Sequence, residues 1–281
     1  MPELPEVETI ARGVHERVRG DRIAEAWFGS HREPFKTPAR RQASELEGRT
    51  ILDVRRVGKH IVCTLGAQQD KKGGGAAGGE AQWIVHLGMT GRLLVTTPDA
   101  PVESHTHARL TLASGRELRF VDPRRFGRLE LRTLDHAEAF AAPGAEPLSI
   151  DREQFAALFR GRKLAIKAAL LNQTLLSGVG NIYADESLFR AGIRPRRHAG
   201  RLSAAELERL RLALADVLRA AIRLGGSSVS DYVDANGVRG FFQLDHRVYR
   251  RTGEPCLVCR TPIRRIVVAG RSTHYCPHCQ H

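Results

Sequence analysis

Four of the five cysteines lie close together near the C-terminus, in two pairs of the form Cys-x2-Cys. The pairs are Cys256 with Cys259 and Cys276 with Cys279, and sixteen residues separate them. Two such pairs, a hairpin's length apart, are typical of a tetrahedral zinc site with four thiolate ligands. Because four thiolates fill the coordination shell, we expect one structural zinc ion with no open position for catalysis.

The segment between the two pairs, Thr261–Tyr275, is rich in arginine and contains Arg264, Arg265 and Arg271. A hairpin that is held by a metal ion and carries arginine is suited to entering a DNA groove, because guanidinium groups bind phosphates and base edges. A solvated basic loop is the alternative interpretation of the same residues.

The N-terminal residues Met1-Pro2-Glu3 offer a different chemistry. Removal of the initiator Met would leave Pro2 with a secondary amine, and an α-amino group has a pKa near ~8, far below that of lysine. A neutral amine of this kind attacks electrophilic carbon and forms a Schiff base. Glu3 lies directly beside it and could donate or accept a proton. The alternative is that these residues simply begin a helix.

The chain is strongly basic, with 44 Lys and Arg against 31 Asp and Glu, a formal net charge of +13 and a pI near 10.3. Such a balance favours a polyanionic partner. The excess is concentrated in residues 239–281, which contain eight Arg, no Lys and two acidic residues. Apolar residues make up 42% of the chain, enough for a buried core, so a wholly disordered protein is excluded.

The sequence contains no apolar run of the length that a membrane helix needs. Its N-terminus carries acids at Glu3, Glu6 and Glu8 in place of the basic and apolar regions of a signal peptide. We therefore expect a cytoplasmic protein, in which the paired cysteines bind a metal ion and form no disulfides.

Periodicity indicates a first half built mainly from strands. Val7, Ile10, Val14 and Val18 recur at helical spacing after Pro5, so a helix should lie near the N-terminus. Short apolar or alternating runs then predict strands at 51–57, 60–65, 83–87, 93–97, 109–113, 117–121 and 127–132. A mostly antiparallel sheet assembly with helices at its edge fits this pattern.

Two connections in this half are recognisable. Ser114-Gly115 separates two alternating runs and predicts a hairpin. Lys71–Gly79 (KKGGGAAGG) has nothing to pack, so we expect a surface loop there. After residue 134 the periodicity becomes helical, with helices predicted at 151–159, 163–173, 181–191 and 203–224. Asp151 can cap the first of these, and Ser203 with Glu206 forms a capping box for the last.

Five motifs occur in order along essentially the whole chain: PELPEVET at 2–9, HLGMTG at 86–91, DPRRFG at 122–127, GVGNIYADESL at 178–188 and the four-cysteine segment. Together they resemble the formamidopyrimidine-DNA glycosylase family. The resemblance implies an α+β multidomain fold with an N-terminal β-sandwich and flanking helices. It also implies a helix–two-turn–helix DNA-binding domain and a C-terminal four-cysteine zinc finger. We place these at 1–134, 151–242 with a lesion-capping loop, and 243–281, with a linker at 135–150.

The same resemblance implies an activity on damaged double-stranded DNA. Family members excise 8-oxoguanine and ring-opened purines and then break the strand at the abasic site by β,δ-elimination. Pro2 would attack the anomeric carbon of the sugar, and Glu3 would transfer protons around it. Lys59 matches the family's lysine at the lesion and at the β-elimination step. Arg271 matches the finger arginine that grips phosphates and is linked to δ-elimination.

Further residues match DNA contacts of the family. Met89, Arg124 and Phe126 would fill the space that an extruded base leaves, a role that suits apolar wedges and a hydrogen-bonding guanidinium. As bare sequence features, Met89 and Phe126 could equally belong to the core.

His105, Arg162 and Asn181 would contact backbone phosphates. Without the resemblance, His105 and Arg162 are ordinary surface residues. Asn181, which follows Gly178-Val179-Gly180, could equally be a helix N-cap.

The sequence departs from the family pattern in the segment 225–242, which matches the lesion-capping loop only loosely. Ser230 stands where a basic residue is expected, and Arg250 stands where a glycine is more usual. These departures put lesion preference in doubt, not reaction type. Two rival functions remain: an endonuclease VIII-like glycosylase for oxidised pyrimidines, and a zinc-ribbon DNA-binding protein without catalysis. A monomer is expected, because each lesion is a single asymmetric site.

Overall fold

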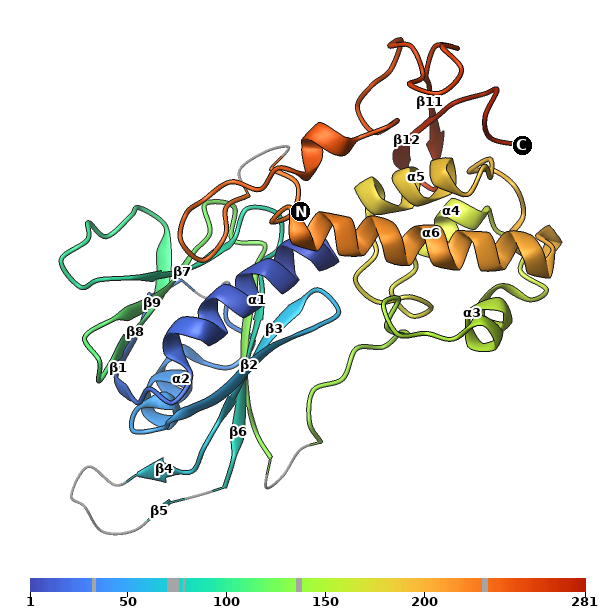
Figure 1. The fold of residues 1–281 in the computed structure, drawn as a ribbon. Helices are drawn as coiled ribbons and strands as arrows, with labels where there is room; N and C mark the ends of the chain where they lie inside the picture. The colour runs from blue at the N-terminus through green and yellow to red at the C-terminus, as the bar shows by residue number, and fades with distance from the viewer. Residues whose placement is uncertain (32–33, 70–75, 78, 135–137, 229–231) are drawn as a thin grey trace. The chain divides into compact units, whose positions relative to one another are not determined.

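The computed structural model describes residues 1–31, 34–69, 76–77, 79–134, 138–228 and 232–281 (Figure 1). The chain forms two compact units. The first unit comprises residues 1–141 and 227–240, and the second comprises residues 142–226 and 241–281. No helix within the described ranges is long and apolar enough to cross a membrane.

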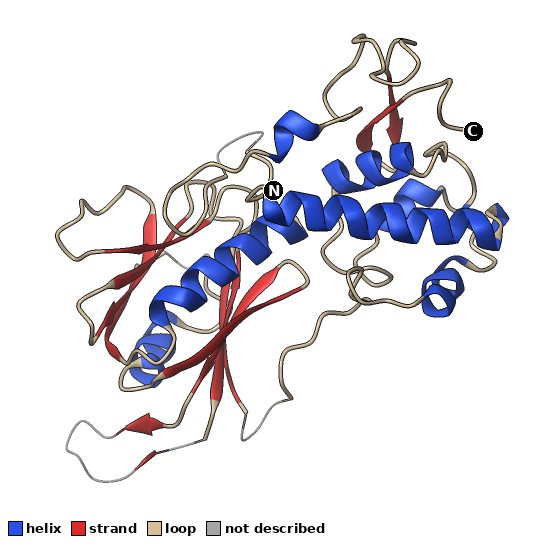
Figure 2. Ribbon diagram, viewed as in Figure 1, coloured by secondary structure: helices blue, strands red, loops and turns tan. Residues whose placement is uncertain are grey.

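The first unit contains two four-stranded antiparallel sheets, drawn in red in Figure 2. One sheet has the order β1 (Ile23–Phe28), β8 (Thr106–Leu112), β9 (Glu117–Val121), β7 (Arg92–Thr96). The other has the order β10 (Arg128–Thr133), β6 (Ala81–His86), β3 (His60–Leu65), β2 (Ile51–Val57). Two-residue strands β4 (Gln68–Gln69) and β5 (Ala76–Ala77) pair separately, and helix α2 (Ala39–Leu46) lies beside β1.

One apolar core connects both sheets with helix α1 (Leu4–Val18). The helix contacts β2 and β3 of one sheet and β7 of the other. Its predicted apolar face is buried at Val7, Ile10, Val14 and Val18, because these side chains lie three or four residues apart on one side of the helix. This packing holds the N-terminus of the chain against the sheets.

Most predicted elements of the first unit are confirmed. Strands β2 and β3 occupy the predicted ranges, and β8 and β9 form the hairpin around Ser114-Gly115. Strand β1 and helix α2 were not predicted. The predicted surface loop at 71–79 falls largely on residues outside the described ranges, and so does Ser230.

The second unit is helical, with a small hairpin near its end. It contains α3 (Arg152–Phe159), α4 (Ile166–Leu171), α5 (Asn181–Arg190) and α6 (Ala204–Arg223). Short 3₁₀ turns lie at Ala199–Arg201 and Phe242–Asp245, and strands β11 (Arg264–Val268) and β12 (Arg271–Tyr275) pair antiparallel. The caps at Asp151 and at Ser203 with Glu206 are present as predicted.

The helix predicted at 163–173 is shorter than expected. The backbone at Leu164 and Ala165 is held extended, because Ala199 N donates to Leu164 O and Ala165 forms a bridge with His198. Helix α4 therefore begins at Ile166. It ends before Asn172, whose side chain accepts a hydrogen bond from Thr174 N and favours a turn over continued helix.

A tight turn joins α4 to α5. The Gln173 side chain accepts a hydrogen bond from Gly178 N at 3.0 Å and donates one to Val179 O at 2.8 Å. Gly178 has a φ of +87°, a left-handed conformation that glycine adopts without a Cβ clash. The side-chain amide of Gln173 thus fixes the turn from which α5 starts at Asn181.

Candidate active site

Pro2 and Glu3 are buried at the beginning of α1. Glu3 is the N-cap residue of this helix and forms a reciprocal capping box with Glu6, in which Glu3 N donates to Glu6 Oε2 at 2.8 Å. Two carboxylates are favourable here, because the first turn of a helix presents free N–H groups and a positive dipole end. The helix therefore fixes Glu3 next to the terminal proline.

The charges around the terminal amine come from four residues. Burial lowers the pKa of the Met1 α-amino group, while the carboxylates of Glu3 and Glu6 act in the opposite direction. The positive charges of Lys59 and Arg124 lower this pKa further. Lys59 is only 8% exposed and lies between β2 and β3. The first unit thus gathers the predicted residues Pro2, Glu3, Lys59 and Arg124 around the terminal amine.

Glu6, which was not among the predicted site residues, connects the surroundings of the terminal amine to a segment of the first unit that is far away in the sequence. Its Oε1 accepts a hydrogen bond from Ser227 N at 2.7 Å, and its carbonyl accepts one from Tyr232 OH at 3.4 Å. Both partners belong to the segment 227–240, which was predicted to be part of the helical domain. The Glu3-x-x-Glu6 spacing of a capping box was the signal that could have drawn attention to Glu6.

Met89 and Phe126 are exposed, by 42% and 48%, so the alternative that they belong to the core is wrong. The Arg124 guanidinium lies over the Phe126 ring, 4.7 Å from its centroid. The loops that carry these residues touch, because a Cβ on Gly88 would lie 2.5 Å from Gly127 N. Both apolar side chains thus project from closely packed loops.

Asp122 organises these two loops. It is fully buried and accepts hydrogen bonds from Thr90 Oγ1 at 2.6 Å and Gly127 N at 2.8 Å. A third, longer bond comes from Arg124 N at 3.3 Å. Asp122 belongs to the motif DPRRFG, but no role was predicted for it.

His105 lines a cleft of about 480 Å³ in the first unit, together with His31, His107 and Arg125. The residue has a φ of +65°, and its carbonyl accepts a hydrogen bond from Asp122 N. Arg125, also in a left-handed conformation, lies with its guanidinium 3.4 Å from His31 Nδ1. Arg125 was not predicted, although it neighbours the predicted Arg124.

The second unit brings together Asn181 and the strand that carries Arg271. Asn181 is the first residue of α5, and its Nδ2 donates to Ser272 O at 2.9 Å, so the side chain does not cap the helix. Arg271 is the first residue of β12 and is exposed. Arg162 is also exposed and lies in the turn after α3, where Gly200 N donates to its carbonyl at 2.9 Å.

The four paired cysteines form one cluster in this unit. Their Sγ atoms all lie within 4.8 Å of one another, with Cys256 and Cys279 3.9 Å apart and Cys259 and Cys276 3.4 Å apart. Tetrahedral zinc with Zn–S bonds of about 2.3 Å requires sulfur atoms about 3.8 Å apart, so the cluster fits this ion. Cys63 lies apart in β3, where burial raises the pKa of its thiol to about 12.

Comparison with known proteins identifies the family. Residues 1–129 match the formamidopyrimidine-DNA glycosylase N-terminal domain, and residues 143–233 match the H2TH domain of the same enzyme. Residues 253–281 match the zinc finger found in FPG and IleRS. The formamidopyrimidine-DNA glycosylase of Solibacter usitatus is 49% identical over 280 residues, covering 100% of this chain and 99% of that protein. The chain belongs to the formamidopyrimidine-DNA glycosylase family.

Solved structures of the formamidopyrimidine-DNA glycosylase family have the same fold. A Lactococcus lactis FPG mutant bound to Fapy-dG containing DNA superposes with a TM-score of 0.87, 35% identity and full coverage of both chains. MutM in complex with DNA containing carbocyclic 8-oxo-G gives a TM-score of 0.86, again at 35% identity and full coverage. The α+β fold with two sheets, an H2TH domain and a four-cysteine finger is therefore confirmed.

In this member of the formamidopyrimidine-DNA glycosylase family, the predicted site residues fall into two groups by unit. The first unit carries Pro2, Glu3, Lys59, Met89, His105, Arg124 and Phe126. The second carries Arg162, Asn181, Arg271 and the four cysteines. Within the first group, Glu3, Lys59 and Arg124 all act on the charge of the terminal amine. Within the second, Ser272 O joins Asn181 to the strand of Arg271.

Proposed function

We propose that the chain is a bifunctional DNA glycosylase and abasic-site lyase that removes oxidised purines from duplex DNA and then cuts the strand. The surroundings of the N-terminus support this proposal most directly: Pro2 and Glu3 are buried, with the charges of Glu6, Lys59 and Arg124 around the terminal amine. Relatives of this fold have been solved with DNA that contains Fapy-dG or 8-oxo-G.

Removal of Met1 is part of the proposal, because a Met1–Pro2 peptide bond leaves the proline nitrogen as a tertiary amide without a free lone pair. After removal, the amine of Pro2 takes the terminal position. The burial that lowers the pKa of the Met1 amine would then act on Pro2, together with the charges of Lys59 and Arg124. A lower pKa increases the neutral, nucleophilic fraction of the amine near pH 7.

The reaction then follows from an amine beside a carboxyl group. The Pro2 nitrogen bonds to C1′ of the sugar, and the bond from C1′ to the base breaks. The base leaves with that electron pair and takes up the proton that the alkylated amine loses. The C1′–O4′ bond opens to give an iminium, and the Glu3 carboxyl group supplies the proton that O4′ takes up. The iminium acidifies C2′–H, so loss of this proton expels the 3′ phosphate. Loss of the C4′ proton then expels the 5′ phosphate.

The remaining residues have supporting roles in this proposal. Lys59 acts at the lesion and in β-elimination, and Arg271 grips phosphate and assists δ-elimination. Met89 and Phe126 fill the space of the extruded base, while Arg124 hydrogen-bonds the base left without a partner. His105, Arg162 and Asn181 contact phosphates. The zinc ion, bound by the four cysteines, holds the β11–β12 hairpin and takes no part in the reaction.

Damaged double-stranded DNA is the proposed partner, in keeping with a net charge of +13. We propose that the protein acts as a monomer, since one lesion presents a single asymmetric site. A cytoplasmic location is proposed, with association with the nucleoid while the protein is bound to DNA.

Borohydride trapping tests the proposed chemistry. The trimmed, zinc-loaded protein is incubated with a duplex that carries one 8-oxoguanine opposite cytosine, and the adduct is mapped by mass spectrometry. We expect a covalent species at Pro2. The control Glu3→Gln keeps the amine but weakens proton transfer, so it should lose base release more than trapping on a preformed abasic site. Binding without trapping or cutting would contradict the proposal. A parallel duplex with an oxidised pyrimidine then distinguishes an endonuclease VIII-like glycosylase, which would cut it, from a protein that only binds DNA.

A further inference from the structure

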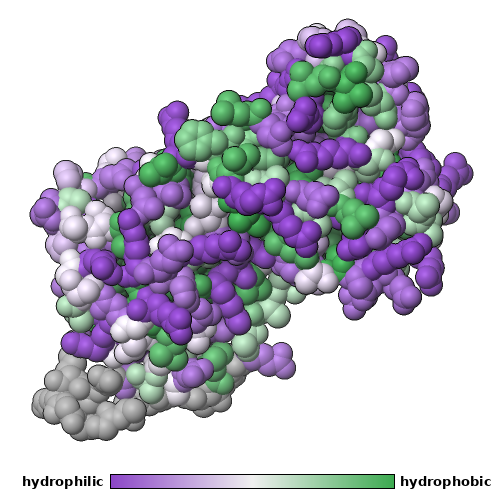
Figure 3. Space-filling model, in the orientation of Figure 1, coloured by the Kyte–Doolittle hydropathy of each residue, from purple (hydrophilic) through white to green (hydrophobic). Residues whose placement is uncertain are grey.

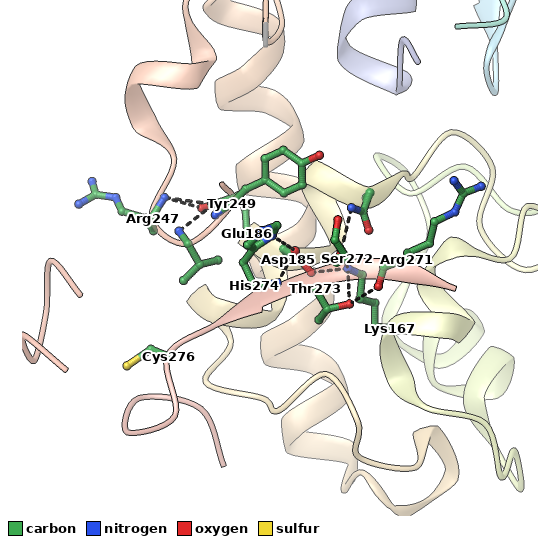
Figure 4. Close-up of polar contacts among 12 residues, drawn as sticks. Lys167, Asp185, Glu186, Arg247, Tyr249, Arg271, Ser272, Thr273, His274 and Cys276 are labelled. Atoms are coloured by element: carbon green, nitrogen blue, oxygen red, sulfur yellow. Dashed lines mark hydrogen bonds and ion pairs between the residues drawn. The ribbon is translucent and has the colours of Figure 1, made fainter. Parts of the chain in front are cut away.

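A buried ion pair in the second unit has no part in the proposed reaction. Lys167 Nζ in α4 lies 2.7 Å from Asp185 Oδ1 in α5, and both side chains have no exposed surface (Figure 4). Lysine and aspartate are almost never fully buried without a partner. Because the loss of hydration of two buried charges offsets most of their attraction, such a pair is a poor source of stability. The hydrogen bonds of Lys167 and Asp185 to β12 indicate a role in positioning that strand.

Lys167 also contacts β12. Its Nζ donates to Ser272 O at 2.9 Å and to Thr273 Oγ1 at 2.8 Å. An ammonium group has three N–H bonds, so it can donate to these acceptors while it is paired with Asp185. Ser272 and Thr273 directly follow Arg271 in the strand, and Thr273 Oγ1 also donates to Arg271 O at 3.0 Å.

Asp185 contacts the same strand with its other oxygen. Its Oδ2 accepts hydrogen bonds from His274 N at 2.8 Å and from His274 Nδ1 at 3.1 Å. The next residue of α5, Glu186, accepts from the backbone N–H groups of 247–249, at distances between 2.8 and 3.1 Å. Successive acids of α5 thus hold the strand β12 and the chain that leads into the finger, as Figure 4 shows.

Ser272 O is shared between two proposed DNA-contacting elements. It accepts from Lys167 Nζ and also from Asn181 Nδ2, both at 2.9 Å. Arg271 precedes this carbonyl, and its guanidinium points away from the network in Figure 4. Polar bonds of this kind fix the register of a strand against a helix, whereas apolar contacts tolerate sliding. The network therefore sets where Arg271 stands relative to Asn181.

We propose that Lys167 and Asp185 are positioning residues for strand cleavage, which hold β12 so that Arg271 and Asn181 grip one stretch of phosphate backbone. The inference rests on the proposed function of Arg271 and Asn181. It differs from a role in stability alone, because it requires the distribution of cleavage products to change even in a variant that folds as well as the wild type.

The decisive variant is the double substitution Lys167→Met with Asp185→Leu, which removes both charges and keeps the branching pattern of each side chain. Replacement of a buried pair by apolar residues is often neutral for folding or stabilising, so this protein should fold and bind zinc. The matched control is Arg119→Met with Glu117→Leu on β9. That pair is also buried, with 2.7 Å between Arg119 Nε and Glu117 Oε2, and Arg119 likewise donates to backbone carbonyls.

The proteins are compared in zinc content, thermal unfolding, and single-turnover cleavage of a duplex with a preformed abasic site. For the double variant we expect the ratio of δ- to β-elimination product to fall about tenfold or more, because small displacements of a catalytic group carry penalties of that order. Borohydride trapping at Pro2 should stay within about twofold of the wild type, since neither Lys167 nor Asp185 is among the groups named as acting on the terminal amine. The slope of log Kd against log salt should fall by about one, for one lost phosphate contact.

An unchanged product ratio and salt slope in the zinc-loaded double variant would overturn the inference, and so would an equal change in the control pair. If the double variant does not fold, the product ratio and the salt slope are measured on Asp185→Asn. This substitution keeps the shape of the side chain and removes the charge that faces Lys167. A wild-type protein that neither traps nor cuts would instead contradict the proposed function. In that case the difference in salt slope between the wild type and the double variant still reports whether the network positions Arg271 on DNA.

Discussion

Thr90 Oγ1 donates a hydrogen bond of 2.6 Å to Asp122 Oδ1, and this bond joins the two loops that carry Met89 and Phe126. The carboxylate is fully buried and binds Gly127 N with its other oxygen. Insertion of side chains into a base stack costs a few kcal/mol, so a wedge works only if its support is rigid. In the proposed function, the Thr90–Asp122 bond provides that support.

The substitution Asp122→Asn tests this connection. An amide has one oxygen where the carboxylate has two, so either Thr90 Oγ1 or Gly127 N loses its acceptor. Because a buried unsatisfied donor costs about 1–3 kcal/mol, we expect the free energy of unfolding to fall by that amount. Single-turnover excision should slow by about tenfold, because the wedge loops lose their fixed geometry. Urea unfolding and quenched-flow excision measure the two effects.

Thr90→Val is the control for this substitution, since it removes one hydrogen bond and leaves Gly127 N paired. It should produce a smaller change in both quantities. If Asp122→Asn is destabilised and yet excises at the rate of the wild type, the rigidity of the two loops does not matter for base removal.

Local signals in the sequence were sufficient for much of the fold. Alternation with period two gave the ranges of β2 and β3, and the spacing of Ser203 and Glu206 gave the beginning of α6. Strand β1 escaped prediction because its register shifts between Ile23 and Glu25, which interrupts the alternation of buried and exposed residues. Helix α2 escaped because it is mostly polar and has no side-chain cap.

The candidate site likewise contains some residues that local sequence signals predict and others that they do not. The zinc ligands follow from local spacing, because each pair of cysteines lies within four residues. Glu6 with Ser227, and Lys167 with Ser272, are pairs separated by 221 and 105 positions in the chain. Such pairs form only when the fold brings distant segments together, and no periodic pattern encodes them. The positioning contacts were therefore visible only in the structure.

Glu6 offers a second test, because both of its oxygens accept backbone N–H bonds, from Glu3 and from Ser227. Glu6→Gln replaces one acceptor by an NH₂ group that faces an N–H donor. We expect a loss of about 1–3 kcal/mol in the free energy of unfolding, and slower trapping at Pro2 because the N-cap turn moves. Glu16→Gln, an exposed position on the same helix, should change neither quantity. Equal behaviour of the two variants would contradict a special role for Glu6.

His86 predicts a dependence of stability on pH. Burial lowers the pKa of its imidazole to about 4, and the nearby positive charges of His60, Lys59, Lys36 and Arg128 act in the same direction. The neutral ring also accepts a hydrogen bond of 3.1 Å from Gly88 N, in the loop that carries Met89. The folded protein therefore favours the neutral form, whereas the unfolded chain has an ordinary histidine pKa near ~6.5.

Because the folded pKa lies below the unfolded value, the unfolded state binds more protons between these two pH values. Stability is complete above about pH 6.5 and falls as the pH is lowered toward 4, by at most about 1.4 kcal/mol per pH unit for this group. Urea unfolding of the wild type and of His86→Gln, measured from pH 7.5 to 4, should give a shallower decline for the variant. Parallel curves would show that another group is responsible.

Zinc removal should affect the second unit, which carries the four cysteines, more than the first. Structural zinc binds with about 10–16 kcal/mol in finger peptides, so only a strong chelator or loss of a ligand should release it. Cys276→Ser is expected to lower zinc content and to weaken DNA binding by about tenfold or more, because the strand that carries Arg271 loses its clamp. Cys63→Ala, in the core of the first unit, should keep full zinc. Metal analysis and binding isotherms measure both effects, and full zinc occupancy in Cys276→Ser would exclude the four-thiolate site.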